Sequence, residues 1–424
     1  MKRYRVALLS AWLPLTAWSG NGLNLIGFGT ESVLMGGADV AVARDTTALN
    51  TNPAGLTSLG RRAADVFGGV AYGSDVRHLD SFGNDRNVSN RVIPIGGFGY
   101  AARLGTSDFT AGIGLFAQGG AGNVYENLTT AFGTVDTLSG LFRIARLSPG
   151  IGWQASDRLS IGASVPITYA DATQKVFPGT SFLNPGKPAE SFFGFDLKGA
   201  RTVQPGLKLG LQYRMSDAAT LGATYTHKTK LPLDGGRLVS NMSALGLGLV
   251  TYRSARIDGL ALPREVAFGV AWEPRAGVLV SVKYAWLNWA DSIRTSTLSA
   301  SNPDHPLAPQ VLSAPSVNNW SNQRIFAIGV AIDLSSSTTL RAGYNHGRNP
   351  IPLNNLNPLL AAIGEQHYTV GLVHRLSPEW AFAYGLEYQR GANATYTNPA
   401  LPFGANAQER SNFPAFHAML SHRW

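Results

Sequence analysis

The chain has 424 residues, no cysteine and a net charge of +9, and only 14% of its residues are charged. Soluble domains carry about 25% charged residues, so this composition is unusual for them, and glycine, at 48 residues, is over-represented. The sequence has no run of lysines and arginines and no basic helix, which argues against a nucleic-acid partner. The lack of cysteine fits an exported chain that uses no disulfides.

Residues 1–19 have the organisation of an export signal. Three basic residues open it, residues 6–18 are apolar, and Ala-Trp-Ser at 17–19 matches a cleavage site. The apolar stretch is shorter than the about 20 residues that a membrane-spanning helix needs, and no later stretch approaches that length. The protein is therefore either secreted and soluble or inserted in a membrane as a closed barrel, which satisfies every backbone group in lipid.

Residues 20–60 are predicted to form a plug, or hatch. The stretch 35–56 lacks the alternation of a strand and the length of a stable helix. A turn is predicted at Asn52, Pro53, Ala54 and Gly55. The residue before a proline avoids the helical region, proline fixes its own φ, and glycine frees the exit. Alone this segment buries too little to fold, so we expect another part of the chain to close around it.

From about residue 63 onward, apolar side chains alternate with small or polar ones. The alternation is clearest at 159–170, 207–214 and 380–389. A period of two sustained over about ten residues is typical of membrane-barrel strands. Strands of soluble sandwiches are usually shorter, at about 5–6 residues.

Short turns and long loops alternate along the rest of the chain. The turns are predicted at 104–108, 156–157, 216–218, 274–277, 335–337 and 377–379, and the loops at 73–92, 119–144, 171–202, 230–263, 290–323, 347–366 and 391–412. This pattern predicts an all-β fold: a barrel of fourteen antiparallel strands in residues 61–424, an even number as in bacterial outer-membrane barrels. Residues 248–258 could form a fifteenth strand. We place them in a loop, because fifteen strands would put the chain ends on opposite sides.

Several segments carry a family resemblance. Asn52-Pro53-Ala54 falls on an Asn-Pro-Ala hatch motif, 262–270 resembles an LP…G strand, and 339–344 with Pro350 resembles an LRxGY…P segment. These motifs are similar to those of the FadL-like family of outer-membrane transporters for long-chain fatty acids and aromatic hydrocarbons, and they cover the hatch and most of 262–390. The resemblance implies a terminal aromatic residue read by the barrel-assembly machinery. Trp424 stands where the family more often has Phe.

No catalytic or cofactor site is predicted. The eight histidines show no HExxH motif or metal-ligand spacing. The glycine-rich stretch at 112–117 lies within one strand and does not open a helix, so it is not a dinucleotide fingerprint. An outer-membrane hydrolase would need a Ser/His/acid set that the sequence does not reveal.

Two predicted loops, 171–202 and 230–263, are unusually apolar. The candidate capture residues in them are Phe182, Phe192, Phe193, Phe195, Met242, Leu245 and Leu247. Apolar clusters in exposed loops indicate either an interaction site or a packed cap, and here both readings stay open. In the resembling family a substrate-capture groove lies between these loops.

Two basic residues are candidates for binding a carboxylate inside the barrel. The alternation places Lys283 and Arg341 on the inward face, where either could form a charge-assisted hydrogen bond to a ligand. The alternative is pairing with protein carboxylates such as Asp39 and Glu387, because an unpaired buried charge is costly.

The third strand, predicted at 109–118, is a candidate exit. Gly112 and Gly114 lie on its inward face, and glycine in a strand often marks a bulge or an interruption of pairing. The resembling family has a kink in this strand that opens a gap towards the membrane beside the hatch. The alternative is that these glycines make room for the plug.

Together these patterns predict a monomeric outer-membrane barrel that takes up hydrophobic molecules passively, either fatty acids or aromatic hydrocarbons. Its surroundings would be outer-membrane lipid and lipopolysaccharide. A general porin for polar solutes is the alternative, and a hydrolase is a more remote one.

Overall fold

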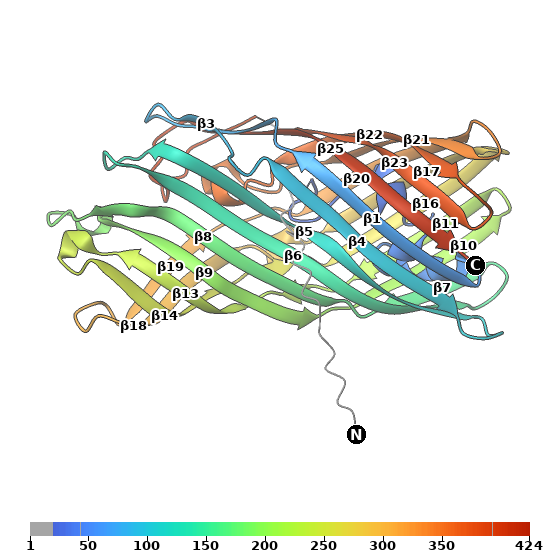
Figure 1. Ribbon diagram of the computed structural model, residues 1–424, viewed down its shortest axis with the longest axis horizontal. Coiled ribbons are helices and arrows are strands. Elements are labelled where there is room, and N and C mark those ends of the chain that lie inside the picture. The colour runs from blue at the N-terminus through green and yellow to red at the C-terminus, as the bar shows by residue number, and fades with distance from the viewer. Residues whose placement is uncertain (1–19, 43, 392) are drawn as a thin grey trace, which may run out of the picture.

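The computed structural model describes residues 20–424 except 43 and 392, so the predicted export signal at 1–19 lies outside the described residues. The described chain is a closed antiparallel barrel with fourteen wall positions. The barrel closes where β1 (Arg62–Tyr72) pairs with the last strand, β25 (Ala407–Arg423), from Ala63↔Arg423 to Ala71↔Ala415 (Figure 1). This confirms the predicted fold class and strand number.

Several wall positions are occupied by two consecutive strands that continue one another. In wall order the strands are β1, β4 (Val92–Arg103), β5 (Phe109–Thr129), β6 (Val135–Gln154), β7 (Leu159–Ser164) with β8 (Ile167–Phe182), β9 (Phe192–Pro205) with β10 (Lys208–Ser216), β11 (Ala219–Thr226) with β13 (Leu233–Asn241), β14 (Leu249–Asp258) with β16 (Glu265–Arg275), β17 (Val278–Leu287) with β18 (Thr295–Pro303), β19 (Val311–Val317) with β20 (Gln323–Asp333), β21 (Thr338–Gly347), β22 (Gly364–Arg375), β23 (Trp380–Gly391) and β25.

The remaining elements are short. They are β2 (Asp75–Leu79), β3 (Asp85–Asn87) and β24 (Ala394–Tyr396) beside the start of β25, the pair β12 (Thr229–Lys230) and β15 (Ala261–Leu262), α1 (Thr30–Leu34), and the 3-10 turns η1 (Thr46–Leu49), η2 (Pro53–Ser58), η3 (Pro188–Glu190), η4 (Ser243–Leu245), η5 (Trp289–Asp291), η6 (Leu353–Asn355) and η7 (Pro358–Leu360). Among the described residues, no helix is long and apolar enough to cross a membrane.

Six short turns gather at one end of the barrel, which we call the turn end, and the longer connections gather at the other, the loop end. All six predicted turns are confirmed as breaks between consecutive wall strands, for example 104–108 between β4 and β5. The C-terminus also lies at the turn end (Figure 1).

The prediction of long unstructured loops was wrong for much of the loop end. Most of 119–144, 171–202, 230–263 and 290–323 is strand, so the wall extends further than the alternation alone indicated. Residues 248–258 are strand rather than loop, because β14 covers Leu249–Asp258. The count nevertheless stays at fourteen, because β14 and β16 occupy the same wall position, between β13 and β18 at the loop end and between β11 and β17 at the turn end.

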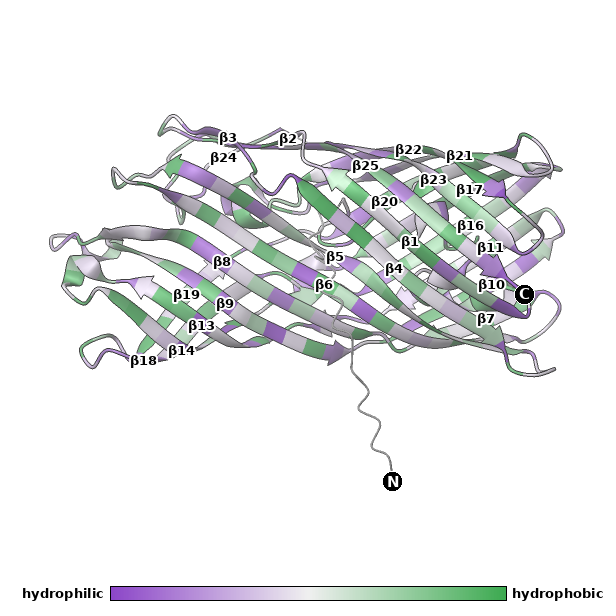
Figure 2. Cartoon of the chain, viewed as in Figure 1, coloured by the Kyte–Doolittle hydropathy of each residue, from purple (hydrophilic) through white to green (hydrophobic). Residues whose placement is uncertain are grey.

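The alternation predicted from the sequence matches the wall. In β16 the exposed large apolar residues are Phe268, Val270 and Trp272, whereas Ala267 and Ala271 are buried. Apolar and polar bands cross the strands in this alternating manner (Figure 2). Large apolar side chains on the outside and small ones inside leave room in the barrel for another part of the chain.

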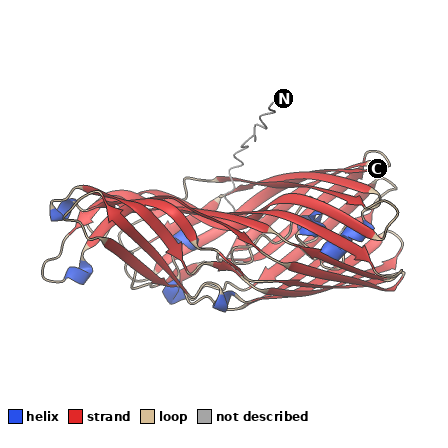
Figure 3. Ribbon diagram, turned by 90° about the horizontal axis from the view of Figure 1, so that it is seen from below, coloured by secondary structure: helices blue, strands red, loops and turns tan. Residues whose placement is uncertain are grey.

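The interior differs between the two ends. At the loop end, buried side chains from the strand extensions and connections form a continuous apolar cluster, which we call the apolar region. Its larger members include Tyr125, Leu138, Phe142, Phe177, Leu197, Tyr252, Trp289, Ile293, Trp320, Leu359, Tyr396 and Phe403. Towards the turn end, α1, η1 and η2 of residues 20–61, the N-terminal segment, lie inside the wall (Figure 3).

Candidate functional site

The Asn-Pro-Ala turn is held by Asn52, which begins η2 and is completely buried. Its side-chain oxygen accepts from the amide of Ala54 at 3.1 Å, which caps the turn. Its side-chain nitrogen donates to the carbonyl of Val40 at 2.7 Å and to that of Leu211 in β10 at 3.1 Å. One side chain therefore shapes the turn, joins it to an earlier part of the N-terminal segment and ties it to the wall.

The wall is shaped to receive this turn. A Cβ added to Gly210 would lie 2.0 Å from the Asn52 side-chain oxygen, and one added to Gly162 would lie 2.3 Å from the Pro53 carbonyl carbon. Neither distance is compatible with a side chain. The glycines on the inward face of β7 and β10 are thus needed for the close approach of the turn.

Polar side chains of the wall satisfy the backbone of the N-terminal segment, which has few regular partners of its own. Ser281 donates to the carbonyl of Ala38 at 2.7 Å, Asn345 to that of Gly36 at 2.9 Å and Thr369 to that of Leu34 at 3.1 Å. Buried carbonyls without partners would be costly. Hydrogen bonds from β17, β21 and β22 therefore fix the position of the segment in the barrel.

Both predicted basic residues pair with carboxylates of the N-terminal segment. Lys283 lies 3.4 Å from Asp39, which also accepts from Ser32 at 2.6 Å, and Arg341 lies 2.5 Å from Glu31. The pairing alternative considered for these residues is thus the one seen here.

The N-terminal segment also contains a carboxyl group with a shifted pKa. Burial, together with the nearby carboxylates Asp65 and Glu31, raises the pKa of Asp45 to about 7, although Thr47 donates to it.

A small cavity lies between the N-terminal segment and the wall. Its volume is about 40 Å³, and it is bounded by Leu25, Ile26 and Phe28 on one side and by charged wall residues on the other. The charged residues are Arg146, Lys208, Glu265 and Lys283, with Asp39 from the segment. Pockets for small organic ligands are typically about 300–1,000 Å³, so this cavity has room for only a few water molecules.

Arg146 and Lys208 are buried, and no carboxylate of the described residues forms an ion pair with either. Arg146 donates to Thr168 at 3.3 Å and Lys208 to Thr226 at 2.9 Å. Arg146 was not among the predicted site residues, although it lies just beyond the predicted loop 119–144. Following the alternation of buried residues through β6 (Leu138, Phe142, Ile144) would have placed Arg146 inside.

The pairing between the third wall strand, β5, and its neighbour β4 ends part-way along both strands. Gly112 and Gly114 pair with β4 on one side, opposite Ala101 and Gly99, and with β6 on the other. The wall is therefore continuous at these two glycines in this structure. The last pair between β4 and β5 is Gly97↔Phe116. We call residues 92–96 of β4 and 117–121 of β5, which face one another beyond this point, the pairing break.

The N-terminal segment takes the place of β4 at the pairing break. The amide of Gly120 donates to the carbonyl of Leu23 at 3.0 Å, and Asn24 forms a bridge with Gly119. The φ angles of Gly119 and Gly120 are 147° and 142°, a region that favours glycine. Gln118 forms a bulge, and its side chain bonds Asn50 at 2.9 Å and Asn24 at 3.2 Å. Residues 23–24 thus lie along the edge of β5 that β4 leaves unpaired.

The predicted capture residues mostly gather at the loop end. Phe132 stacks on Phe192 with ring centroids 4.7 Å apart and contacts Phe182 at 5.5 Å. Phe193, Phe195 and Leu247 are partly buried against the apolar region, and Met242 is buried in it. Leu245 is 41% exposed and lies outside this packing. Phe132 and Phe177, which the sequence analysis did not select as site residues, complete the aromatic cluster.

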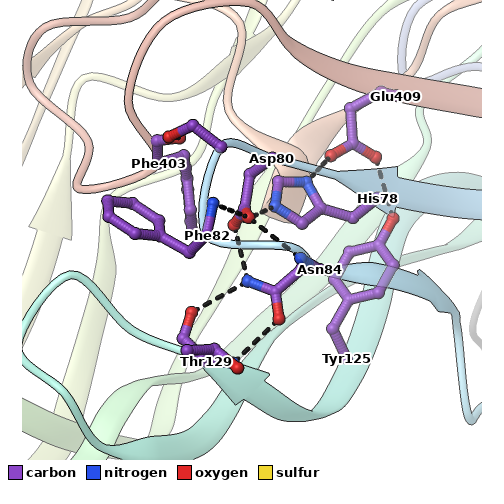
Figure 4. Close-up of polar contacts among 9 residues, drawn as sticks. His78, Asp80, Phe82, Asn84, Tyr125, Thr129, Phe403 and Glu409 are labelled. Atoms are coloured by element: carbon purple, nitrogen blue, oxygen red, sulfur yellow. Dashed lines mark hydrogen bonds and ion pairs between the residues drawn. The ribbon is translucent and has the colours of Figure 1, made fainter.

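A polar cluster interrupts the apolar region (Figure 4). His78 of β2 is fully buried and lies 2.5 Å from Glu409 through Nδ1 and 3.2 Å from Asp80 through Nε2. Tyr125 donates to the other oxygen of Glu409 at 2.8 Å, and Asn84 donates to Asp80 at 2.7 Å. Burial alone would lower the pKa of His78, but Glu409 and Asp80 raise it to about 9. The cluster joins the connection 73–91 to β5 and β25.

The sequence profile of the family described as outer membrane protein transport protein (OMPP1/FadL/TodX) matches residues 29–415. The chain belongs to this family. It is therefore an outer-membrane protein of a family that transports hydrophobic compounds, and its relatives are channels rather than enzymes. The loop end is accordingly the outer side of the membrane and the turn end the periplasmic side.

Solved structures of this family share the fold at low sequence identity. The P. putida toluene transporter TodX is 19% identical with a TM-score of 0.78, covering 95% of this chain and 99% of that one. The Ralstonia pickettii toluene transporter TbuX is 18% identical with a TM-score of 0.73, covering 95% and 99%. A Pseudomonas aeruginosa FadL homologue is 15% identical with a TM-score of 0.75, covering 95% and 99%. A search of curated proteins finds no match.

Proposed function

We propose that this protein moves small hydrophobic molecules passively across the outer membrane and releases them sideways through the pairing break. The observation that carries the proposal is that β4 and β5 separate beyond Gly97↔Phe116 and that residues 23–24 occupy the edge of β5 that β4 leaves unpaired. A non-covalent occupant of a strand edge can leave it, and its departure would free a path between the barrel interior and lipid.

The route starts at the loop end. The aromatic cluster around Phe132 and Phe192 would take up substrate from outside, and the apolar region would conduct it inward. Apolar surface costs about 25 cal/mol per Å² to hydrate. A lateral exit avoids that cost, because the molecule passes from an apolar interior into lipid without crossing periplasmic water.

Residues 25–28 would form the gate on this route. Leu25, Ile26 and Phe28 line both the cavity of about 40 Å³ beside Arg146 and a second cavity of about 20 Å³ beside Ile95 of β4. Displacing them would join the two cavities next to the pairing break. The residues 20–60 would then act as a hatch: the Asn52 turn keeps the body of the segment seated while its first residues move.

The charges of the larger cavity favour a substrate with a carboxylate. Arg146, Lys208 and Lys283 face Asp39 and Glu265, which leaves one positive charge in excess. A fatty acid would supply the missing anion and a charge-assisted hydrogen bond. An aromatic hydrocarbon would use the same apolar route without this contact.

Two further partners follow from the position of the chain in the outer membrane. The exposed apolar wall would contact membrane lipid. Around the loop end it would contact lipopolysaccharide. Trp424 lies at the turn end, with its amide donating to the carbonyl of Arg62 at 3.1 Å and its ring beside Tyr100 and His422. We propose that the assembly machinery reads this residue and that the barrel works as a monomer.

Uptake of labelled oleate and labelled toluene tests the proposal, in cells whose only outer-membrane channel for hydrophobic molecules is this one. We expect accumulation of oleate well above that of cells without the channel, and a smaller gain for toluene. Liposomes containing the purified protein should not become permeable to sugars. Sugar permeation, or no gain for either hydrophobic substrate, would contradict the proposal and favour the polar-solute porin.

A further inference from the structure

Three titratable side chains meet on the inner wall near the start of the N-terminal segment. Glu387 of β23 lies 2.7 Å from Nδ1 of His367 in β22 and 2.9 Å from Nε2 of His417 in β25. All three residues are less than 10% exposed. None of the steps proposed above for transport uses them.

His367 has a hydrogen-bonding atom with no partner. Its Nδ1 contacts the carboxylate, so in the neutral ring the proton lies on Nδ1 and Nε2 is an acceptor. Among the described residues, nothing bonds this Nε2, although His367 is only 1% exposed. Directly opposite in the β22–β23 register lies Gln389, whose side-chain oxygen is also buried without a partner. Two neighbouring acceptors therefore require a donor.

The backbone of Gly20 lies against this acceptor. A Cβ added to Gly20 would be 1.8 Å from Nε2 of His367, so the glycine Cα is in contact with the imidazole. The position tolerates only glycine, and Gly20 is buried. The group that Gly20 carries on its nitrogen is consequently close enough to meet the unpaired acceptor after a small rotation.

We propose that cleavage after Ser19 creates an α-ammonium group on Gly20 that docks onto Nε2 of His367 beside Glu387. Hydrolysis of the Ser19–Gly20 peptide bond by a signal peptidase consumes one water and leaves a carboxylate on Ser19 and an ammonium on Gly20. An ammonium brings three donors and no acceptor, which suits a site with unpaired acceptors. It also brings a positive charge beside the buried carboxylate, whose ion-pair partners are both histidines and are charged only when protonated.

The docked N-terminus would anchor the first residues of the hatch to the wall. The second cavity is lined by Gly20, Leu25 and Phe28 together with Glu387 and His417. The anchor and the residues proposed as a gate thus border one space. This inference does not depend on the substrate or on lateral exit, because it concerns only how the processed chain is held.

The test uses the mature protein purified from outer membranes in detergent. Its intact mass and N-terminal sequence should show a chain that begins at Gly20, and any other start would overturn the proposal. The α-amino group is then labelled with 2-pyridinecarboxaldehyde, which reacts selectively with N-terminal amines. We expect labelling of the folded protein to be at least about tenfold slower than labelling of the unfolded chain, because the docked amine is buried and protonated. Equal rates would show that a water or another group fills the site instead.

Two variants on β22 separate docking from general burial. His367→Phe keeps a ring and removes the acceptor, and it should raise the labelling rate of the folded protein at least fivefold. His374→Phe, on the same strand but bonded to Thr338 and Tyr384, should leave the rate unchanged. An unchanged rate in folded His367→Phe would overturn the proposal. If that variant does not give the heat-modifiable folded band, the wild-type rate and the N-terminal sequence still decide.

Discussion

The two halves of the barrel interior are filled by different chemistry. At the loop end, wall side chains pack on one another in the apolar region, with contacts such as Phe132 on Phe192. At the turn end, polar wall residues such as Ser281 and Asn345 hold the carbonyls of the N-terminal segment. Apolar packing is non-directional and adapts to a guest, whereas hydrogen bonds fix one position. Under the proposed function, substrate passage would fall to the loop end and gating to the seated segment.

The largest effect is expected from locking the gate. Leu25 and Ile95 line the same small cavity, one on the N-terminal segment and one on β4 at the pairing break. In a Leu25→Cys/Ile95→Cys variant, a short cleavable bis-thiol reagent should reduce uptake to that of cells without the channel. The chain has no native cysteine, so the reaction is specific.

Adding a reductant after cross-linking should restore uptake, and each single-cysteine variant treated in the same way should transport normally. Full transport by the cross-linked protein would remove the segment from the route. The N-terminal segment would then only fill the barrel interior at the turn end.

Removing the wall tether of the hatch should have the next largest effect. Asn52→Ala removes the donor that bonds the carbonyls of Val40 and Leu211, although Gln212 still donates to that of Val40 at 3.2 Å; each hydrogen bond lost contributes about 0.5–1.5 kcal/mol. A loss of about 1.4 kcal/mol already shifts an equilibrium tenfold, so we expect uptake to fall about tenfold. The heat-modifiable folded band should persist. Asn354→Ala, at an exposed position in a loop-end connection, is the control.

The alternation of the wall could be predicted from the sequence because a strand repeats every two residues, and the six turns because their residues break the strand. The loop-end strands were missed because their inward faces are apolar as well: in β6, Leu138 and Phe142 face inward, so alternation with polar residues disappears.

Features that depend on contacts between residues distant in the sequence could not be predicted from the sequence. The family resemblance indicated a break in the third strand, but Gly112 and Gly114 resemble Gly119 and Gly120 in sequence. Only the pairing with Leu23 and Asn24 distinguishes them. Likewise Lys283 and Arg341 were candidates for a ligand until Asp39 and Glu31 were seen beside them.

The charged cavity offers a test of whether the channel prefers a carboxylate substrate to a hydrocarbon. In Arg146→Met/Lys208→Met the apolar route is intact but the cationic partners are lost. A hydrogen bond to a charged group contributes about 1.5–3 kcal/mol, so the ratio of oleate to toluene uptake should fall by about tenfold. Arg143→Met is the matched control, because Arg143 lies on β6 but pairs with Asp171. An unchanged ratio would show that the cations serve only to seat the segment.

Capture at the loop end should respond more moderately. Replacing Phe192, Phe193 and Phe195 by Ser removes partly buried rings from the edge of the apolar region. Full burial of such a side chain contributes about 1.5–3 kcal/mol, and partial burial about half, shared among several contacts. We expect roughly fivefold slower uptake at limiting substrate and normal uptake at high concentration. Val203→Ser, exposed on the same strand, should have no effect.

The smallest effect concerns the polar cluster within the apolar region. The pKa of His78 is raised from 6.5 to about 9, so the charged imidazolium stabilises the connection 73–91 fully below pH 6.5, and this contribution is lost as the pH rises through 9. One pKa unit corresponds to about 1.4 kcal/mol, so the charge on His78 stabilises the connection by roughly 3 kcal/mol at most.

Subtilisin should therefore cut this connection several-fold faster at pH 10 than at pH 8, relative to an unfolded peptide of the same sequence. His78→Gln should abolish the difference, and the seated N-terminal segment should stay protected at both pH values. Equal protection of the connection at pH 8 and pH 10 in the wild type would show that its packing, and not the charge on His78, holds it.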